Sequence, residues 1–253
     1  HIHGFATLDV VQSFLIAHWL KKKIVYSPHY HPFKYLQRPF WGRLYFYGCL
    51  RFLLRFASAI VTITDNDTAF LTKYHKRVYK IPHQFESSRE VYRMPDTKQG
   101  NMILFVGRND NNKGIFYLYT LDSKYEIHLV TKGGVKRKDF IVHNNISSGE
   151  LSALYERAAL VVIPSRYEAF SYVALEAFAH GTPVVMSDRV MIADYLKDCK
   201  GYNTFKFGDI KDFLQAVEKT IGQSVDMDKI LPQFEKVKIK ASYKNVYERV
   251  INK

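Results

Sequence analysis

Two glutamates in the segment from Leu160 to Asp188 have a spacing that could serve ligand chemistry. Glu168 lies in a loop after a short apolar run, and Glu176 follows eight residues later inside a predicted helix. The carboxyl end of a parallel strand that leads into a helix N-terminus is where open α/β sheets bind phosphorylated ligands. Because the backbone N–H groups at such a place favour anions, a carboxylate there indicates a neutral, hydroxyl-rich group such as a sugar.

The elements that would position these glutamates form a βαβ unit. Residues 160–163 are all apolar, as in a strand buried on both faces, and Pro164 ends the run because proline cannot donate to a ladder. Residues 173–179 favour a helix, Gly181 lies where a C-terminal cap belongs, and residues 184–186 are the next apolar run.

The composition is that of a globular protein with a strong positive charge. The chain has 253 residues, of which 47% are hydrophobic and 24% charged, and its formal net charge is +13. This charge indicates an anionic partner, which could be nucleotide phosphates, nucleic acid or an acidic membrane surface. Cys49 and Cys199 lie far apart without metal-ligand spacing, so a reducing compartment is expected rather than a disulfide scaffold.

The apolar runs and the start of the chain bear on targeting. No run reaches the roughly 18–20 residues that a spanning helix needs, and no signal peptide is visible. The chain opens at His1 without a methionine, so we expect the printed sequence to lack its native start.

Strands alternate with helices in two blocks, which a polar segment at residues 82–100 separates. This alternation predicts an α/β fold with two Rossmann-like domains, whose parallel sheets face each other across a ligand-binding cleft. The first domain is predicted at residues 1–95, incomplete at its start and joined by a C-terminal helix at 238–253; the second is predicted at 96–237. Strands are predicted at 1–4, 24–27, 59–64, 78–81, 102–106, 125–131, 140–142, 160–163, 184–186 and 203–207, and helices at 8–20, 65–74, 115–121, 147–157, 173–179, 209–220 and 238–252.

Three of these helices have recognisable start signals. Asp65 and Asp209 are expected to cap the helices that follow them, since an aspartate at this place accepts from an unpaired backbone N–H. Ser147 and Glu150 fit a capping box, in which each side chain satisfies the backbone donor of the other.

Four sequence features together resemble glycosyltransferase family 4, a group of retaining enzymes with the GT-B fold. The run PSRYEAFSYVALEAFAHGTPVV, from Pro164 to Val185, is a near match to the Glu-x7-Glu motif of that family. Val106-Gly107-Arg108 followed by Lys113-Gly114 is similar to a second family feature, and the histidines of YSPHYHP to a third. Ile81-Pro82-His83-Gln84 is a degraded form of a fourth, an Ile-Pro-Asn-Gly turn. The resemblance covers nearly the whole chain but implies that about one or two βα units precede His1 in the family pattern.

The resemblance implies a nucleotide-sugar donor site in the second domain. Glu168 would contact the donor sugar near its reacting carbon, and Glu176 would accept hydrogen bonds from the ribose hydroxyls. Arg108 and Lys113 would neutralise the diphosphate leaving group, and backbone N–H groups at residues 170–172 would add to this anion site. The alternative is a set of solvated surface charges. The residues implied in donor binding are Gly107, Arg108, Lys113, Glu168, Ala169, Phe170, Ser171, Tyr172 and Glu176, of which Ala169 and Ser171 replace two glycines of the family.

Histidines of the first domain are the implied acceptor-side residues. His29 would reach the donor sugar and complete a catalytic set with Glu168, Arg108 and Lys113, while His31 is an alternative or a second acceptor residue. A structural loop histidine is the competing interpretation, and a zinc site is a weak one because no third ligand has suitable spacing. His83 and His180 are taken as structural.

Metal and cofactor chemistry is not expected. Asp65-Asn66-Asp67 is similar to the Asp-x-Asp that binds manganese in the other large glycosyltransferase fold, but its place directly before a helix favours capping. We therefore predict neither a catalytic metal nor a cofactor.

The aromatic and basic segment from Phe33 to Phe56 has two interpretations. It could be an interfacial helix on an anionic membrane that carries a lipid-linked acceptor, or a core helix whose arginines reach solvent. Nucleic-acid binding is disfavoured because the chain lacks an RRM or helix-turn-helix signature.

The resemblance implies a retaining, metal-independent glycosyltransferase of the hexosyltransferase type. It would move a sugar from a UDP- or GDP-linked donor to a hydroxyl of a glycan, lipid-linked or protein-linked acceptor. The alternatives are a non-catalytic nucleotide-sugar-binding module and a phosphorylase or synthase-like enzyme of the same fold. The expected location is the cytoplasm, with peripheral contact to the inner face of the membrane.

Overall fold

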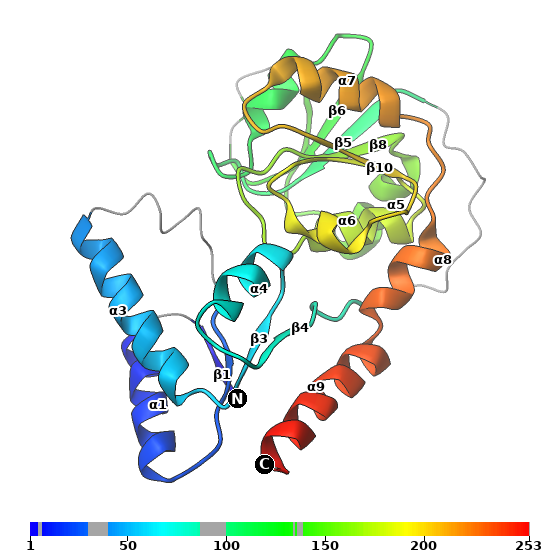
Figure 1. Ribbon diagram of the computed structural model, residues 1–253. Helices are drawn as coiled ribbons and strands as arrows, with labels where there is room; N and C mark the ends of the chain where they lie inside the picture. Colours follow the sequence, from blue (N-terminus) through cyan, green and yellow to red (C-terminus); the bar gives the residue numbers. More distant parts are fainter. Residues whose placement is uncertain (5–6, 30–39, 87–99, 134, 136–138, 253) are drawn as a thin grey trace. The chain divides into compact units, whose positions relative to one another are not determined.

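The chain forms two compact units, which a computed structural model describes for residues 1–4, 7–29, 40–86, 100–133, 135 and 139–252 (Figure 1). Unit 1 consists of His1–Gln84 together with Glu235–Lys253, and unit 2 is the continuous segment Phe85–Phe234. Each unit has its own sheet and its own hydrophobic clusters.

The sheet of unit 1 has four parallel strands in the order β1-β2-β3-β4. The strands are β1 (Ile2–His3), β2 (Val25–Ser27), β3 (Ala59–Thr62) and β4 (Val78–Lys80). His3 is in register with Ser27, so the residues that follow β1 and β2 leave the sheet at the same edge. His29 follows β2 at this edge.

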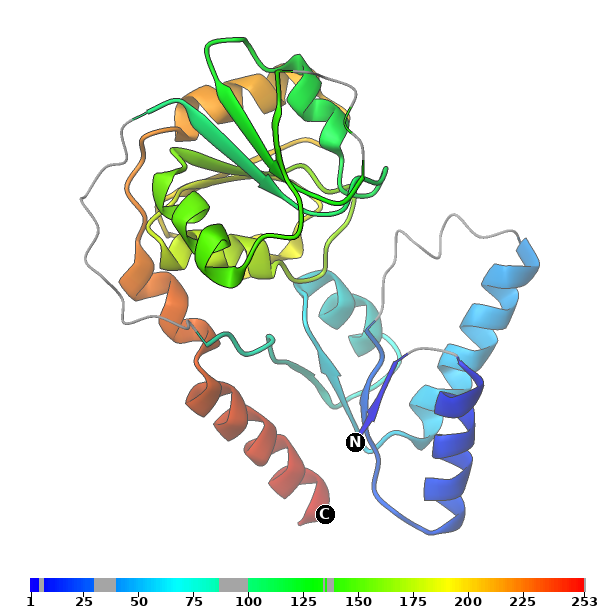
Figure 2. The same ribbon diagram turned by 180° about the vertical axis from the view of Figure 1, so that it is seen from behind.

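Helices cover both faces of this sheet (Figures 1 and 2). Three helices, α1 (Leu8–Trp19), α3 (Phe40–Phe56) and α4 (Asp65–Thr72), bury apolar side chains against Tyr26 and Ile60 on one face. The C-terminal helix α9 (Lys236–Ile251) packs against Val25, Ala59 and Val61 on the other. Alternate residues of β2 and β3 therefore point to opposite faces, as the pleat requires.

One expectation for unit 1 is wrong, and one of the two interpretations of the aromatic segment gains support. The cap of α4 is Thr64 rather than Asp65: Thr64 is extended, and its hydroxyl accepts from the backbone N–H of Asp67 at 3.0 Å. Asp65 is already helical and its carboxylate pairs with Lys80 at 2.5 Å. The aromatic segment forms α3 from Phe40 onward, with Leu53 and Leu54 in the core and Arg51 and Arg55 exposed.

The sheet of unit 2 has six parallel strands in the order β10-β9-β8-β5-β6-β7. β5 and β8 are neighbours at the centre of the sheet. The strands that follow β5 in the chain, β6 and β7, lie on one side of this pair, and those that follow β8, β9 and β10, lie on the other. The carboxyl ends of these two strands therefore border the topological switch point, where open α/β sheets bind ligands. The strands are β5 (Met102–Val106), β6 (Glu126–Val130), β7 (Ile141–His143), β8 (Leu160–Ile163), β9 (Val184–Ser187) and β10 (Tyr202–Phe205).

Two hydrophobic clusters cover the faces of this second sheet. Val161 and Ile163 of β8 point into one cluster, and Leu160 and Val162 point into the other, so this strand is buried on both faces as predicted. The first cluster contains side chains of α5 (Ser148–Arg157), α6 (Tyr172–Ala179), η2 (Met191–Tyr195), α8 (Met227–Ile230) and η3 (Leu231–Phe234), and the second contains those of η1 (Ile115–Thr120) and α7 (Ile210–Thr220).

The local signals in unit 2 are mostly confirmed. Ser147 and Glu150 form the capping box of α5, Asp209 caps α7, and Gly181 takes a positive φ of 64° directly after the end of α6. The predicted helix at 115–121 is a 3-10 helix instead. It has six residues between a left-handed Gly114 and an extended Leu121, which suits a short run of i→i+3 bonds.

Candidate functional site

Two loops at the switch point of unit 2 are joined by close contacts. Gly114 follows β5 with φ +67°, and a Cβ there would lie 2.9 Å from the carbonyl carbon of Pro164 and closer still to its oxygen. The backbone N–H of Arg166 donates to the carbonyl of Asn112 at 2.6 Å. Only glycine allows this approach, because it has no Cβ and tolerates a left-handed backbone. The loop after β5 is therefore held against the loop after β8.

This contact brings Lys113 and Glu168 together. The Lys113 ammonium lies 3.0 Å from Oε2 of Glu168, and the hydroxyl of Ser165 donates to the same oxygen at 2.9 Å. Only 20% of the Lys113 side chain and 14% of the Glu168 side chain are exposed. Gly107 lies beside the lysine, since a Cβ there would be in ordinary van der Waals contact with the aliphatic carbons of Lys113, at 3.6 Å. The pair is thus a fixed, partly buried unit with charges of opposite sign.

The backbone of Glu168 is anchored on its other side as well. Its N–H donates to the carbonyl of Arg189 at 3.1 Å, and its carbonyl accepts from the N–H of Met191 at 2.8 Å, as an isolated parallel bridge with Val190. The carboxylate is therefore positioned by backbone contacts and by Lys113 and Ser165 together. Such pre-positioned groups need little reorganisation when a ligand binds.

Glu176 is oriented by a residue that sequence reasoning missed. Tyr155 of α5 donates its hydroxyl to Oε2 of Glu176 at 2.7 Å. The pKa of Tyr155 is raised above its usual range, first by burial and then by the negative charge of Glu176, so the phenol stays a donor. A buried tyrosine hydroxyl needs a polar partner, and Tyr155 within the predicted helix at 147–157 was the available signal.

His180 supports the same helix. Its Nδ1 donates to the Glu176 carbonyl at 2.7 Å, its Nε2 shares a hydrogen bond with the Ser152 hydroxyl at 2.6 Å, and the ring stacks on Tyr155 with centroids 5.4 Å apart. These contacts fit the predicted structural role of His180.

Arg108 lies on the same loop as Lys113 but not in the same cluster. Its side chain is 77% exposed and its guanidinium pairs with Asp110 at 3.2 Å. The structure thus brings Lys113, Glu168 and Gly107 together, while the Arg108 guanidinium lies on the solvent side of the loop.

The residues before α6 serve its start. Ser171 is the N-cap of the helix, and its buried hydroxyl accepts from the backbone N–H of Ala174 at 3.4 Å. The ring of Phe170 lies 5.6 Å from the ring of Phe234 and 5.3 Å from that of Tyr172. Ala169 joins Glu168 to this helix start, so the predicted donor segment from 168 to 172 leads directly into α6.

Unit 1 presents a row of histidines at the carboxyl edge of its sheet. His29 has a left-handed backbone with φ +46°, and its Nε2 lies 3.2 Å from Nδ1 of His3. The ring of His29 stacks between those of His3 and His83, with centroid distances of 5.4 and 5.9 Å. Burial lowers the pKa values of His3 and His83 from their usual range, so these two rings favour the neutral form. His31 lies outside the described residues.

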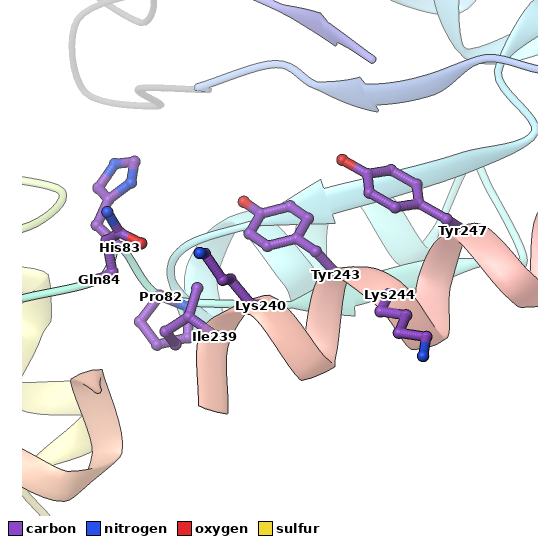
Figure 3. A pocket seen from close by; sticks show the side chains of 8 residues that line it. All are labelled: Pro82, His83, Gln84, Ile239, Lys240, Tyr243, Lys244 and Tyr247. Atoms are coloured by element: carbon purple, nitrogen blue, oxygen red, sulfur yellow. The ribbon is translucent and has the colours of Figure 1, made fainter. Parts of the chain in front are cut away.

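A hollow of about 430 Å³ lies beside His83 along α9 (Figure 3). Tyr243 and Tyr247 lie on the same side of the helix, and Lys244 points to the opposite side. Sequence reasoning assigned no site residue to this hollow. Its lining residues are Pro82, His83, Gln84, Ile239, Lys240, Tyr243, Lys244 and Tyr247.

Metal-ligating residues do not gather in the described part of the chain. No group of three or more His, Cys, Asp or Glu side chains among these residues is arranged to hold an ion. Asp65 and Asp67, which resembled a manganese motif, lie in the first turn of α4. The absence of metal from the reaction stays a prediction.

Solved structures of the same architecture define the class. Sucrose-phosphate synthase from Thermosynechococcus elongatus aligns with a TM-score of 0.72 at 19% identity, over 99% of this chain and 73% of that one. A protein from Anabaena solved in complex with UDP aligns with a TM-score of 0.69 at 13% identity, over 98% of this chain and 79% of that one. At such identities the likeness establishes the fold alone. The chain has the GT-B fold, and the predicted α/β class with one parallel sheet in each of two units is confirmed.

The chain belongs to the family described as glycosyl transferases group 1, whose model matches residues 86–233. An uncharacterized glycosyltransferase of Methanocaldococcus jannaschii is 41% identical over an alignment of 104 residues that covers 34% of this chain and 27% of that protein. An uncharacterized protein from the cps region of Klebsiella pneumoniae is 22% identical over an alignment of 223 residues that covers 78% of this chain and 62% of that protein. The matches thus span less than two thirds of either relative, and the predicted membership of a glycosyltransferase family is confirmed at this level.

Proposed function

We propose that this protein is a retaining, metal-independent glycosyltransferase of the family 4 type. It would move a hexosyl group from a nucleotide-diphosphate sugar to a hydroxyl acceptor. Membership of a glycosyltransferase family supports sugar transfer. The observation that carries the donor assignment is the fixed Lys113–Glu168 pair at the switch point of unit 2.

On donor binding, Lys113 and Glu168 would contact two different parts of the nucleotide sugar. Lys113 would turn from Glu168 to the diphosphate oxygens, where a point charge stabilises the leaving group. Glu168, still held by Ser165, would then accept a hydrogen bond from a hydroxyl of the transferred sugar. Arg108 is exposed enough to leave Asp110 and pair with the same diphosphate through its planar fork.

Glu176 would hold the ribose of the donor. A carboxylate accepts two hydrogen bonds from a vicinal diol, and the hydroxyl of Tyr155 fixes one of its oxygens beforehand. The turn from Ala169 to Tyr172 would place the backbone N–H groups of the α6 start near the phosphates. The donor would be UDP- or GDP-linked, and UDP is the nucleotide bound in the Anabaena structure of the same fold.

The transfer would occur on one face of the sugar. The bond between the anomeric carbon and the phosphate oxygen breaks, and the acceptor oxygen bonds to that carbon from the same side. The acceptor proton passes to the departing phosphate oxygen, so no enzymic nucleophile is needed. Lys113 and Arg108 offset the charge that develops on the diphosphate, which is the role that a metal takes in other enzymes.

Unit 1 would supply the acceptor side through His29. Its left-handed backbone is uncommon for a residue with a side chain, and such conformations concentrate at functional sites. The acceptor would be a glycan, a lipid-linked saccharide or a protein-linked hydroxyl, and His31 stays a predicted second contact. With two free cysteines and no disulfide among the described residues, the cytoplasm, at the inner face of the membrane, is the proposed location.

Turnover of a panel of UDP- and GDP-linked sugars tests this function, with and without simple sugar acceptors. We expect Glu168→Gln and Lys113→Met each to lower the transfer rate by roughly 10²–10³-fold, since each removes charge stabilisation at the reacting centre. The matched control is Lys124→Met, which removes an exposed lysine of the same unit that pairs with Glu218. Circular dichroism would confirm that all three variants fold.

Four outcomes decide between the candidates. Near-normal transfer by both site variants would refute the site, and an inverted anomeric configuration in the product, read by NMR, would refute retention. Nucleotide binding without turnover of any donor would favour a non-catalytic binding module. Sugar-1-phosphate formation from a glycan and phosphate would favour a phosphorylase.

A further inference from the structure

Helix α1 carries an apolar stripe on its exposed side. Leu8, Leu15 and Trp19 follow one another at spacings of seven and four residues, which places them on one line of the helix. Their exposed fractions are 72%, 51% and 80%, whereas Val10 and Phe14 on the inward side are buried. A surface helix normally turns charged or polar residues outward, so this stripe indicates an interaction surface.

Helix α3 continues the apolar surface. Phe40, Leu44 and Phe52 are 70%, 56% and 38% exposed. The ring of Phe52 contacts that of Phe56 at 4.9 Å, and Phe56 contacts His18 of α1 at 4.6 Å. Figures 1 and 2 both show α1 and α3 side by side. We call this combined area the α1–α3 surface; its apolar members are Leu8, Leu15, Trp19, Phe40, Leu44 and Phe52.

The same surface is bordered by cations. Lys21, Lys22 and Lys23 follow α1 and are exposed. A hollow of about 400 Å³ beside α3 is lined by Arg51, Leu54, Arg55, Lys73 and Tyr74, with three cations and no carboxylate. Within the described part of the chain, none of these six cations forms an ion pair. Helix α3 contains no acidic residue, and Asp9 is the one acidic residue of α1.

We propose that the α1–α3 surface docks on an anionic lipid bilayer. The apolar side chains enter the boundary between headgroups and acyl chains, and the hollow beside α3 takes a lipid phosphate. Exposed aromatic and leucine side chains bordered by lysine and arginine are what an interfacial helix requires. Membrane phosphates supply the negative charge that the six cations lack within the protein.

Other occupants fit these observations less well. A two-fold contact between two copies of the chain would place the same surface on both sides. The cations of one copy would then face the cations of the other and repel them. A nucleic acid would use the cations but gives no reason for Leu15 and Trp19 to be exposed. The docking itself does not depend on the proposed function. Only its biological role rests on that function, because the bilayer is where the enzyme would meet a lipid-linked acceptor.

Vesicle flotation of the full chain tests the docking directly. The probes are phosphatidylcholine vesicles with and without phosphatidylglycerol, each at low and high salt. We expect binding to the phosphatidylglycerol vesicles that weakens as salt is raised, because charge attraction to the surface is screened. Equal binding to both vesicle types, or no binding to either, overturns the proposal.

Two double variants separate the apolar and the cationic contributions. Leu15→Ser with Trp19→Ser should lower partitioning by at least about tenfold, since two exposed apolar groups no longer enter the bilayer. Arg51→Gln with Arg55→Gln should lower it by about twenty-five-fold, at about fivefold for each charge removed. All four side chains are exposed, so the fold does not depend on them.

Matched controls use equivalent changes outside the surface. Val237→Ser with Ile251→Ser removes two apolar side chains of α9 that are 79% and 71% exposed. Lys211→Gln with Lys219→Gln removes two charges from α7 of unit 2. If the control variants lose as much vesicle binding as the surface variants, the proposal is overturned. It is also overturned if the protein binds an oligonucleotide but no vesicles, and the arginine variant abolishes the oligonucleotide binding. Because flotation needs no catalysis, an inactive protein that still floats refutes the proposed function and leaves the docking standing.

Discussion

Glu176 shows how one hydrogen bond can orient a site residue before any ligand arrives. Its carboxylate lies on α6, and the hydroxyl that holds it comes from Tyr155 on α5. Since the tyrosine is buried and its pKa is raised, the phenol remains a donor across the working pH range. The same reasoning applies to Glu168, which Ser165 and Lys113 hold together.

Tyr155→Phe should therefore raise the KM for the nucleotide sugar by about tenfold and leave kcat nearly unchanged. A hydrogen bond to a charged group contributes about 1.5–3 kcal/mol, and losing it frees the ribose ligand to rotate. Steady-state kinetics with a varied donor would measure the change.

Tyr117→Phe is the matched control for that substitution. Tyr117 is also fully buried in unit 2, but in the cluster on the other face of the sheet. Its hydroxyl accepts a hydrogen bond from the N–H of Gly208 at 2.5 Å. It should cost comparable stability without changing the KM. An equal rise in KM for both variants would contradict the positioning role of Tyr155.

At the scale of elements, the site depends on the contact between the loops after β5 and β8. These strands are neighbours in the sheet but are separated by 53 residues in the chain, from Val106 to Leu160. Gly114 is what lets the two loops touch, because any side chain there would overlap Pro164. The Lys113–Glu168 pair is a consequence of that contact.

Gly114→Ala should lower the free energy of unfolding by about 2–4 kcal/mol, from backbone strain and overlap together. It should also slow transfer, since the displaced loop would carry Lys113 away from the position of the diphosphate. Gly208→Ala is the control, because Gly208 also has a positive φ, of 103°, but a Cβ there meets nothing within 4 Å. Backbone strain alone should then lower the free energy of unfolding by about 1–2 kcal/mol. Denaturant unfolding of both variants measures the difference, and equal costs would show that the overlap with Pro164 is relieved.

At the scale of the whole molecule, the two units differ in how the chain builds them. Unit 2 is continuous from Phe85 to Phe234, and both of its hydrophobic clusters lie inside that range. Unit 1 is discontinuous, because α9 from the end of the chain covers one face of a sheet made near its start. Among the described helices, none is both long and apolar enough to span a bilayer.

A fragment of residues 85–234 should therefore fold by itself and bind a nucleotide without transferring sugar. A fragment of residues 1–84 should not fold, since the face of β2 and β3 with Val25, Ala59 and Val61 loses its cover. Thermal melting followed by circular dichroism compares the two, with UDP as the added nucleotide. A cooperative transition in the shorter fragment would contradict the role given to α9.

The sequence by itself determined the elements and the class. The parallel α/β pattern, the capping box at Ser147, the cap at Asp209 and the doubly buried strand 160–163 are all local signals, because each depends on residues close together in the chain. Lys113, Glu168 and Glu176 could be singled out for the same reason, since their motifs occupy short segments next to strand ends.

The tertiary structure decided which of these residues meet. It pairs Tyr155 with Glu176, and Arg108 with Asp110 rather than with the Lys113–Glu168 pair. It also makes Thr64 the cap of α4, while Asp65 pairs with Lys80. It also left the stripe of α1 exposed, which a helical pattern cannot show because either side of an apolar helix could face the core. Contacts between elements depend on topology and packing, and these lie beyond the range of any local pattern.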